Sequence, residues 1–195
     1  MTDDAALSRD LHPTPGLGAP DASELPVDDA AQAARIQQYW ELVRGRAGLG
    51  RAAVVTGPGW ATSVPPEAWA FGDSPELADE LLELVLIGRK TATAAAVWEY
   101  EAAGEPLPTP GALSIVLDGA RAPRALLRTV EVVTVPFAEV TAEQAYLEGE
   151  GDRSLEEWRA GHERYWRRTL PPLGHEFAPD MLVVWERFEV LHPRL

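Results

Sequence analysis

Apolar side chains at helical spacing predict a first helix over residues 29–44. Ile36, Trp40 and Val43 fall on one face of such a helix, and Gly45 ends the pattern. From Gly45 to about residue 69 the chain is rich in glycine and proline. We expect this stretch to be mostly loop, with one short strand at 52–56.

A wide apolar face predicts a second helix between Ser74 and Gly88. Leucine and valine recur through residues 77–86, Ser74 is a suitable N-cap, and Pro75 fits the first turn. Gly88 suits the position just after a helix. Lys90 is therefore expected to follow the end of a well-anchored helix.

The second half of the chain combines strand patterns with helix-capping patterns. Runs rich in valine, leucine and isoleucine predict strands at 113–119, 124–135 and 181–191. Thr141 with Gln144 and Ser154 with Glu157 are spaced as capping boxes, which predicts a short helix followed by a longer one. The longer helix carries a stripe made of Leu155, Trp158, His162, Tyr165, Trp166 and Thr169.

Helices and strands do not alternate regularly along the chain. This order favours the α+β class, with a mainly antiparallel sheet that is curved or barrel-like. The 195 residues suit one domain of ordinary size, and the hydrophobic fraction of 46% is enough for a packed core. Residues 1–28, with four prolines and many acids, are expected to form a flexible tail, or less simply a partner-binding segment.

Charge and composition narrow the classes of function. The net charge is −14, of which −6 falls in the first thirty residues and −8 in the remainder, so an anionic ligand would need a local cluster of cations. The absence of cysteine excludes disulfides, thiolate metal sites and a cysteine nucleophile. Neither a signal peptide nor a membrane-spanning run is recognisable, so we expect a soluble cytoplasmic protein that does not bind membranes.

The segment "GRKTAT" at residues 88–93 is the first candidate site. Cations near the end of a helix interact favourably with its dipole, which by itself accounts for Lys90. Alternatively, Lys90 and Thr93 face one pocket, where a partly buried lysine loses enough pKa to serve as a base and the hydroxyl acts as a nucleophile. The residues alone do not decide between these two interpretations of Lys90.

The second candidate is the acidic loop "LEGEGDRS" at residues 147–154. Glu148, Glu150 and Asp152 alternate with glycines, and three carboxylates so close together call for a neighbouring cation or metal to offset their repulsion. A solvated acidic loop is the simpler interpretation. The spacing of an EF-hand is absent, and the four histidines show no paired metal-binding pattern, so no metal or cofactor is predicted.

Several segments in order resemble the ASCH-domain proteins in their longer bacterial form. They are "WAFGDSPELADELLELVLIGRKTATAA", "GEPLPTPGALSIVLDG", "RTVEVVTVPFAEV", "EGEGDRSLEEWRAGHERYW" and "VVWERFEVL". The resemblance covers roughly residues 31–195. It implies a PUA-like fold, a small β-barrel flanked by helices, with a cleft suited to RNA or nucleosides. An ASCH domain is therefore expected over residues 29–195, with its core at about 66–195.

The resemblance also implies a catalytic trio. In ASCH proteins with enzyme activity, a lysine and a threonine of a K-T-x-T segment act with a glutamate of the acidic loop, and these fall on Lys90, Thr93 and Glu150. Some members remove the acyl group from N4-acylcytidine nucleosides without a metal, and at least one longer member is a ribonuclease. A neutral Lys90 taking a proton from Thr93 or water, with Glu150 orienting or reprotonating it, fits the first reaction. The same groups fit the second.

Substrate contacts are expected beside the trio. The aromatic candidates for base stacking are Phe71 and Trp98, with Tyr100 nearby, and the candidate phosphate ligands are Arg89, Arg128 and Arg153. Thr91 and Glu148 complete the predicted binding set. Ala94, Ala95 and Ala96 stand where members of the family often carry polar residues, which removes possible substrate hydrogen bonds.

The sequence thus predicts a hydrolase of RNA or of a cytidine-type nucleoside. The acidic remainder of the chain favours a small nucleoside, whereas the longer chain form favours the ribonuclease. Two alternatives from other classes stand beside it: a non-catalytic RNA- or nucleotide-binding module, and an adaptor that works through the acidic tail. The oligomeric state is left open.

Overall fold

The computed structural model describes residues 29–47 and 64–194. The tail expected at 1–28 and the short strand expected at 52–56 lie outside the described residues. The predicted helix at 29–44 is confirmed as α1 (Asp29–Val43), followed by a 3-10 turn, η1 (Arg44–Ala47).

Five strands form one mixed sheet in the order β1-β3-β4-β5-β2. They are β1 (Glu67–Ala70), β2 (Ala92–Ala96), β3 (Leu113–Leu117), β4 (Pro123–Pro136) and β5 (Leu182–His192). Only the pairing of β1 with β3 is parallel within this sheet, so the predicted mainly antiparallel arrangement is confirmed.

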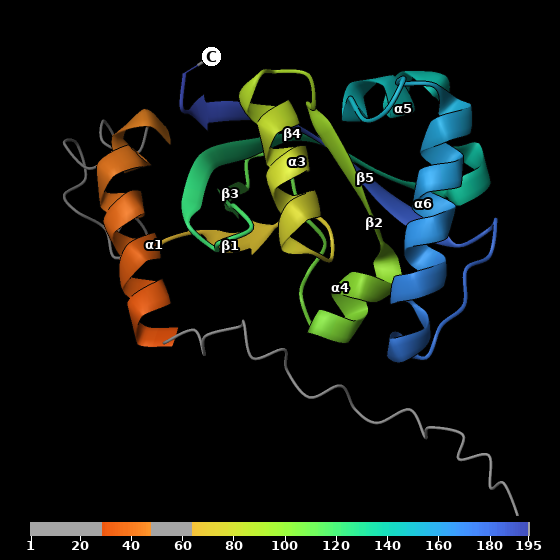
Figure 1. The fold of residues 1–195 in the computed structure, drawn as a ribbon, viewed down its shortest axis with the longest axis horizontal. Coiled ribbons are helices and arrows are strands. Elements are labelled where there is room, and N and C mark those ends of the chain that lie inside the picture. Colours follow the sequence, from red (N-terminus) through yellow and green to blue (C-terminus); the bar gives the residue numbers. More distant parts are fainter. Residues whose placement is uncertain (1–28, 48–63, 195) are drawn as a thin grey trace, which may run out of the picture.

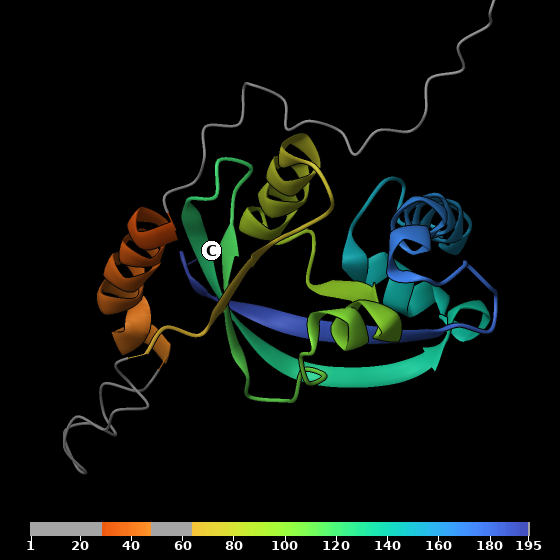
Figure 2. The same cartoon turned by 90° about the horizontal axis from the view of Figure 1, so that it is seen from below.

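The sheet curls into a half barrel around the two long strands β4 and β5 (Figure 2). The pairing of these two strands shifts register between Leu126 and Leu127 and again between Thr129 and Glu131. Such irregularities bend a strand and increase its twist. Bending of the long strand pair leaves a concave face on which a ligand cavity can form.

Helices cover the sheet in three groups (Figure 1). Trp40 and Val43 of α1 pack on Ile115 and Leu126, while α3 (Pro75–Leu86) packs its leucines and Val85 on a separate apolar cluster of β3, β4 and β5. At the other end lie α5 (Ala142–Glu148) and α6 (Leu155–Thr169).

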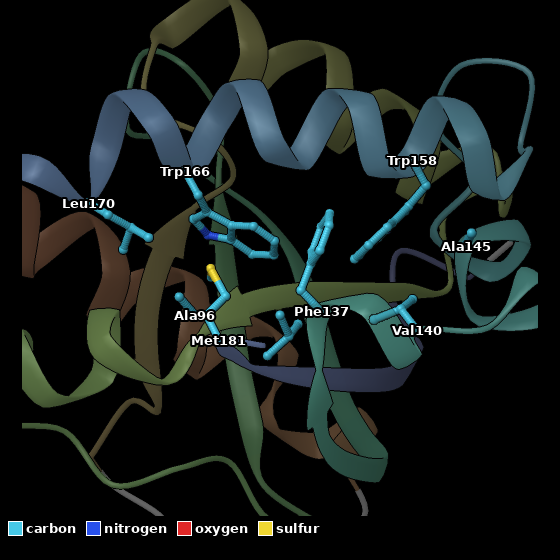
Figure 3. Packing of buried hydrophobic residues seen from close by; sticks show 9 residues of the cluster. Ala96, Phe137, Val140, Ala145, Trp158, Trp166, Leu170 and Met181 are labelled. Atoms are coloured by element: carbon cyan, nitrogen blue, oxygen red, sulfur yellow. The ribbon is translucent and has the colours of Figure 1, made fainter. Parts of the chain in front are cut away.

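The tryptophans of α6 anchor that helix to the rest of the fold. Figure 3 shows Trp158 and Trp166 reaching from α6 toward Phe137, and the ring centroids of Phe137 lie 5.3 Å and 5.7 Å from theirs. Burying a large apolar side chain stabilises a fold by about 1.5–3 kcal/mol. The predicted stripe on α6 therefore does face the core, and it fixes the beginning of the helix beside the acidic loop.

The predicted caps are confirmed at two helices and altered at a third. Ser74 Oγ accepts a hydrogen bond from the Leu77 amide at 3.2 Å, and Thr141 and Gln144 form their capping box. At α6, Ser154 accepts from the Glu157 amide as predicted, but the Glu157 carboxylate accepts from the Asp152 amide instead of closing the box.

Two short elements were not predicted. Strand β1 lies in the stretch expected to be loop, and α4 (Val97–Ala103) directly follows β2. The Glu99 carboxylate accepts a hydrogen bond from the Ala96 amide at 2.6 Å, which starts α4 without a capping side chain at Ala96. Both elements border the cavity described below.

Candidate functional site

Backbone hydrogen bonds hold the "GRKTAT" segment against the acidic loop. The Leu147 carbonyl accepts from both the amide and the hydroxyl of Thr91, at 2.9 Å and 3.1 Å. On the other side, the Leu84 carbonyl accepts from the amides of Arg89 and Lys90, which fixes them to the end of α3. Lys90 is therefore held between a helix end and the loop that follows α5.

Gly149 permits this close approach. Its φ is +75°, and a Cβ built on it would lie 2.3 Å from the carbonyl oxygen of Arg89. A positive φ and a backbone contact of this kind both favour glycine over any other residue. Gly149 thus lies at the point where the acidic loop meets the "GRKTAT" segment.

Arg89 and Arg153 serve the loop itself. The guanidinium of Arg89 donates to the Gly151 carbonyl, and that of Arg153 donates to the Arg89 carbonyl at 3.2 Å while lying over the ring of Tyr146. These contacts tie the loop to the helix end. The two cations were predicted to contact substrate phosphate, and here they are engaged with backbone carbonyls.

The structure brings Lys90, Glu148 and Glu150 together. Lys90 Nζ lies 2.6 Å from Glu150 Oε1 and 3.4 Å from Glu148 Oε2, and only 1% of the lysine side chain is exposed. The cation expected to offset the acidic loop is therefore Lys90. Among the described residues there is no cluster of histidine and carboxylate side chains suited to a metal ion.

This environment keeps Lys90 charged. Burial alone lowers the pKa of Lys90, but the carboxylates of Glu150 and Glu148 outweigh that effect, and the pKa is raised. The expectation of a neutral lysine that takes a proton is wrong for this ground state, because the argument from burial omitted the two adjacent negative charges.

Glu148 also contacts Trp158 and His162 of α6. Its Oε1 accepts a hydrogen bond from Trp158 Nε1 at 2.7 Å, and its Oε2 lies 3.5 Å from His162 Nε2. Burial raises the pKa of Glu148, but Lys90, His162 and the bond from Trp158 bring it below the usual value. Burial likewise lowers the pKa of His162, and the charge of Glu148 raises it more.

The sequence placed His162 on the stripe of the longer helix, but its pairing with Glu148 was not predicted. The signal available was its spacing, because His162 follows Trp158 by four residues and therefore lies on the same face of α6. Its Nδ1 lies 3.0 Å from the Trp158 carbonyl. The ring is thus held in place from both sides.

A cavity of about 430 Å³ lies beside this cluster, between the curled sheet and α4. Thr93 and Phe71 line it, whereas Lys90 and Glu150 do not. Phe71 borders both places, since its ring centroid lies 5.4 Å from Lys90 Nζ. Within the described part of the chain, the Thr93 hydroxyl has no hydrogen-bond partner, and nothing places it against Lys90.

The cavity is aromatic and acidic. Its lining includes four aromatic rings and three carboxylates, and none of its described lining residues is a lysine, arginine or histidine. The rings are those of Trp69, Phe71, Tyr100 and Tyr165, and the carboxylates are those of Glu67, Glu99 and Glu186. Sequence reasoning missed these carboxylates, because they come from β1, α4 and β5, which are distant from one another along the chain.

Burial affects two of the cavity carboxylates. It raises the pKa of Glu67, with Glu105 adding to the effect, and it raises the pKa of Glu186, where the charge of Glu67 adds and a hydrogen bond from Thr129 opposes. Both groups therefore hold a proton more tightly than an exposed glutamate does.

Two predicted substrate contacts lie away from the cavity. Trp98 stacks on the ring of His175, with centroids 4.3 Å apart, and it packs against the core cluster of α6. Arg128 pairs with Glu189 on the outside of the sheet, at 2.7 Å. Of the residues considered as substrate contacts from the sequence, the cavity lining includes Phe71, Thr93 and Tyr100.

Comparison with known proteins shows the family. Residues 67–192 match the model of the ASCH domain, so the chain belongs to the ASCH-domain family, as its resemblance implied. Among curated proteins, none matches the chain. Within the described ranges, no helix has the length and apolar character needed to cross a membrane.

Two solved bacterial structures are similar to this one. The crystal structure of protein EF3133 from Enterococcus faecalis V583 is 32% identical, with a TM-score of 0.66, over 80% of this chain and 88% of that one. An ASCH domain from Lactobacillus crispatus JV V101 is 28% identical, with a TM-score of 0.61, over 75% and 94%. The curled sheet with its flanking helices is accordingly the predicted PUA-like fold.

Proposed function

We propose that this protein is a hydrolase of acylated nucleosides, with N4-acylcytidine as the representative substrate. The observation that supports it most is the position of Thr93. Its hydroxyl lines the cavity and has no hydrogen-bond partner among the described residues. Phe71, which lines the same cavity, contacts Lys90, and Lys90 pairs with Glu150. Membership of the ASCH-domain family makes this class of substrate a natural choice.

Two properties of the cavity favour a nucleoside over an RNA chain. A volume of about 430 Å³ falls in the range of small-molecule sites. Its carboxyl groups and aromatic rings suit an uncharged base, and the described lining residues offer phosphate no cation. RNA binding usually rests on lysine and arginine, and the arginines near this site are occupied by carbonyls or a carboxylate.

The roles that we propose for Lys90 and Glu150 follow from their charges. Because Lys90 is held as an ammonium ion, it orients Glu150 and offsets negative charge. The Glu150 carboxylate, whose side chain is 34% exposed, is the proton acceptor. The oxygen of Thr93 or of water bonds to the acyl carbon and its proton passes to Glu150. The carbon–nitrogen bond then breaks as Glu150 returns that proton to the leaving amine.

If Thr93 is the nucleophile, the acyl group passes to its oxygen and is then released by water. If water attacks directly, Thr93 orients it. Glu148, Trp158 and His162 do not touch the substrate in either scheme. They hold Lys90, and through it Glu150, in position.

The experiment incubates purified protein with N4-acetylcytidine and, in parallel, with a short single-stranded RNA. Wild type is compared with Thr93→Val, and with Arg128→Ala as a control outside the cavity. We expect release of cytidine and acetate by wild type and the control, a large loss in Thr93→Val, and intact RNA. Cleavage of RNA without deacylation would replace the proposed substrate, and inactivity on both would favour a binding module.

A further inference from the structure

Glu186 is a buried carboxyl group that no cation among the described residues neutralises. Its residue is 7% exposed, it lies in the middle of β5, and it lines the cavity. The Thr129 hydroxyl donates to its Oε1 at 3.1 Å. Within the described part of the chain, its Oε2 receives no hydrogen bond, and no lysine, arginine or histidine pairs with it.

The sheet places this group beside the predicted reaction centre. Glu186 is directly opposite Thr93 in the pairing of β2 with β5. Opposite residues in an antiparallel pair carry their side chains on the same face, with Cβ atoms about 4.5–5.5 Å apart. Both side chains line the cavity, so a ligand that reaches Thr93 also meets Glu186.

A buried carboxyl group without a cation is stable only when its charge is removed or matched. The groups around Glu186 do not match it: Glu67 faces it from β1, Tyr100 from α4, and Thr129 from β4. Burial raises the pKa of Glu186, which favours the protonated form. Thr129 donates to Oε1, so the proton belongs on Oε2.

In that form the carboxyl group presents an acceptor and a donor side by side. A heterocycle that carries an amino N–H next to a ring nitrogen with a free lone pair offers the complementary edge. Oε1 accepts from the amino group while Oε2 donates to the ring nitrogen, and the aromatic rings of the cavity wall supply surfaces against which a flat base packs. Acylation of the amino group leaves one N–H for this contact.

We propose that Glu186 is the base-reading residue of the cavity, selecting heterocycles in which an exocyclic N–H adjoins an unsubstituted ring nitrogen, as in cytosine. This inference rests on the proposed function for the nature of the ligand, since it deepens the choice of a cytidine-type substrate. It assigns recognition to a residue outside the trio of Lys90, Thr93 and Glu150.

The test measures binding of cytidine, the deacylated product, by tryptophan fluorescence and calorimetry. Glutamine keeps a donor and an acceptor side by side, so Glu186→Gln should bind cytidine within about threefold of wild type. Glu186→Leu should lose about tenfold or more. Glu189→Gln, on the same strand but paired with Arg128 outside the cavity, is the control and should be unchanged.

Two further arms sharpen the test. N4,N4-dimethylcytidine has no amino N–H and should bind wild type about tenfold or more weakly than cytidine does. Cytidine binding to wild type should weaken as the pH rises through the pKa of Glu186, because ionisation removes the donor, whereas binding to Glu186→Gln should stay flat. Thermal unfolding of each variant confirms that it is folded.

Equal binding of cytidine by wild type and Glu186→Leu would overturn the inference, as would equal binding of the dimethylated ligand by wild type. Loss of binding in Glu186→Gln as large as in the leucine variant would also overturn it, because it would require an ionised carboxylate. Binding needs no turnover. Glu186-dependent binding without deacylation would therefore remove only the proposed function, and deacylation unaffected by Glu186→Leu would remove only this inference.

Discussion

Glu148 and Glu186 are both almost fully buried, but their surroundings differ. Glu148 has Lys90, His162 and the indole N–H of Trp158 around it, and its pKa lies below the usual value. Glu186 accepts a hydrogen bond from the Thr129 hydroxyl and lines the cavity, and its pKa lies above the usual value of a glutamate. The environment therefore favours the charged form of the glutamate in one place and the protonated form in the other.

The difference separates two tasks. The cluster around Lys90 is complete without a ligand, which suits a group that must be held in one orientation. The cavity leaves polar atoms without partners, which suits a group that binds something else. Phe71 borders both, so the two parts meet at one side chain.

The largest expected effect on stability comes from removing Lys90 from the cluster around it. Lys90→Met leaves Glu148 buried with His162 and the Trp158 indole N–H but without the lysine charge, and we expect the free energy of unfolding to fall by about 3–5 kcal/mol. Denaturant titration measures it. Glu186→Gln is the matched comparison and should change stability by less than about 1 kcal/mol. Equal losses in the two variants would contradict the division between them.

The next effect concerns the contact between the acidic loop and the helix end. Gly149→Ala places a Cβ against the Arg89 carbonyl and should cost about 2–4 kcal/mol of unfolding free energy. Gly104→Ala has a similar φ of +69° with open space around it, so it should cost only about 1–2 kcal/mol. Denaturant titration measures both losses, and the larger loss at Gly149 is the cost of the close approach to the Arg89 carbonyl. Equal losses in the two variants would mean that the loop can move away from this carbonyl.

A smaller effect follows from His162 and pH. Its folded pKa is raised above 6.5, so its proton stabilises the folded state. The contribution is complete below about pH 6.5 and is lost as the pH rises through the folded pKa. We expect the free energy of unfolding of wild type to exceed that of His162→Gln by about 1 kcal/mol at low pH. Denaturant titration over a series of pH values should show this difference closing as the pH rises.

The control for this pH effect is a pair of variants that lack the carboxylate. In a Glu148→Gln background, substitution of His162 should no longer produce a stability gap that depends on pH. A gap that persists there would assign the proton of His162 to another partner.

The smallest effect is expected outside both regions. Arg128 pairs with Glu189 where each side chain is largely exposed. Arg128→Ala should change the free energy of unfolding by no more than about 1 kcal/mol and leave cytidine binding unaltered. A marked loss of binding would return Arg128 to the substrate contacts predicted from sequence.

The sequence predicted much of the fold because its signals are local. The caps at Ser74 and Thr141 and the stripe on α6 depend on residues within one or two turns of each other. Strand β1 was missed because four residues with two alanines carry little periodicity. Helix α4 was missed because its start depends on a carboxylate, Glu99, that folds back to the Ala96 amide.

The candidate site was predictable only in part, and largely by resemblance. The two segments that carry Lys90 and Glu150 stand out in sequence, and the structure brings them together. The charge state of Lys90 was not predictable, because it depends on how close two carboxylates come. Glu186 gave no signal at all, since a single acid in a strand becomes unusual only when it proves to be buried at a cavity with no cation beside it among the described residues.

The central claim is that Glu150, held by the cluster around Lys90, accepts the proton in the reaction, while the cavity binds the base and carries Thr93. Glu150→Gln tests it most directly, with turnover of N4-acetylcytidine and affinity for cytidine measured on the same preparation. We predict that turnover falls by about 10²–10⁴-fold while the affinity stays within about threefold of wild type. Turnover at the rate of wild type, or an affinity reduced as much as in Glu186→Leu, would contradict the account.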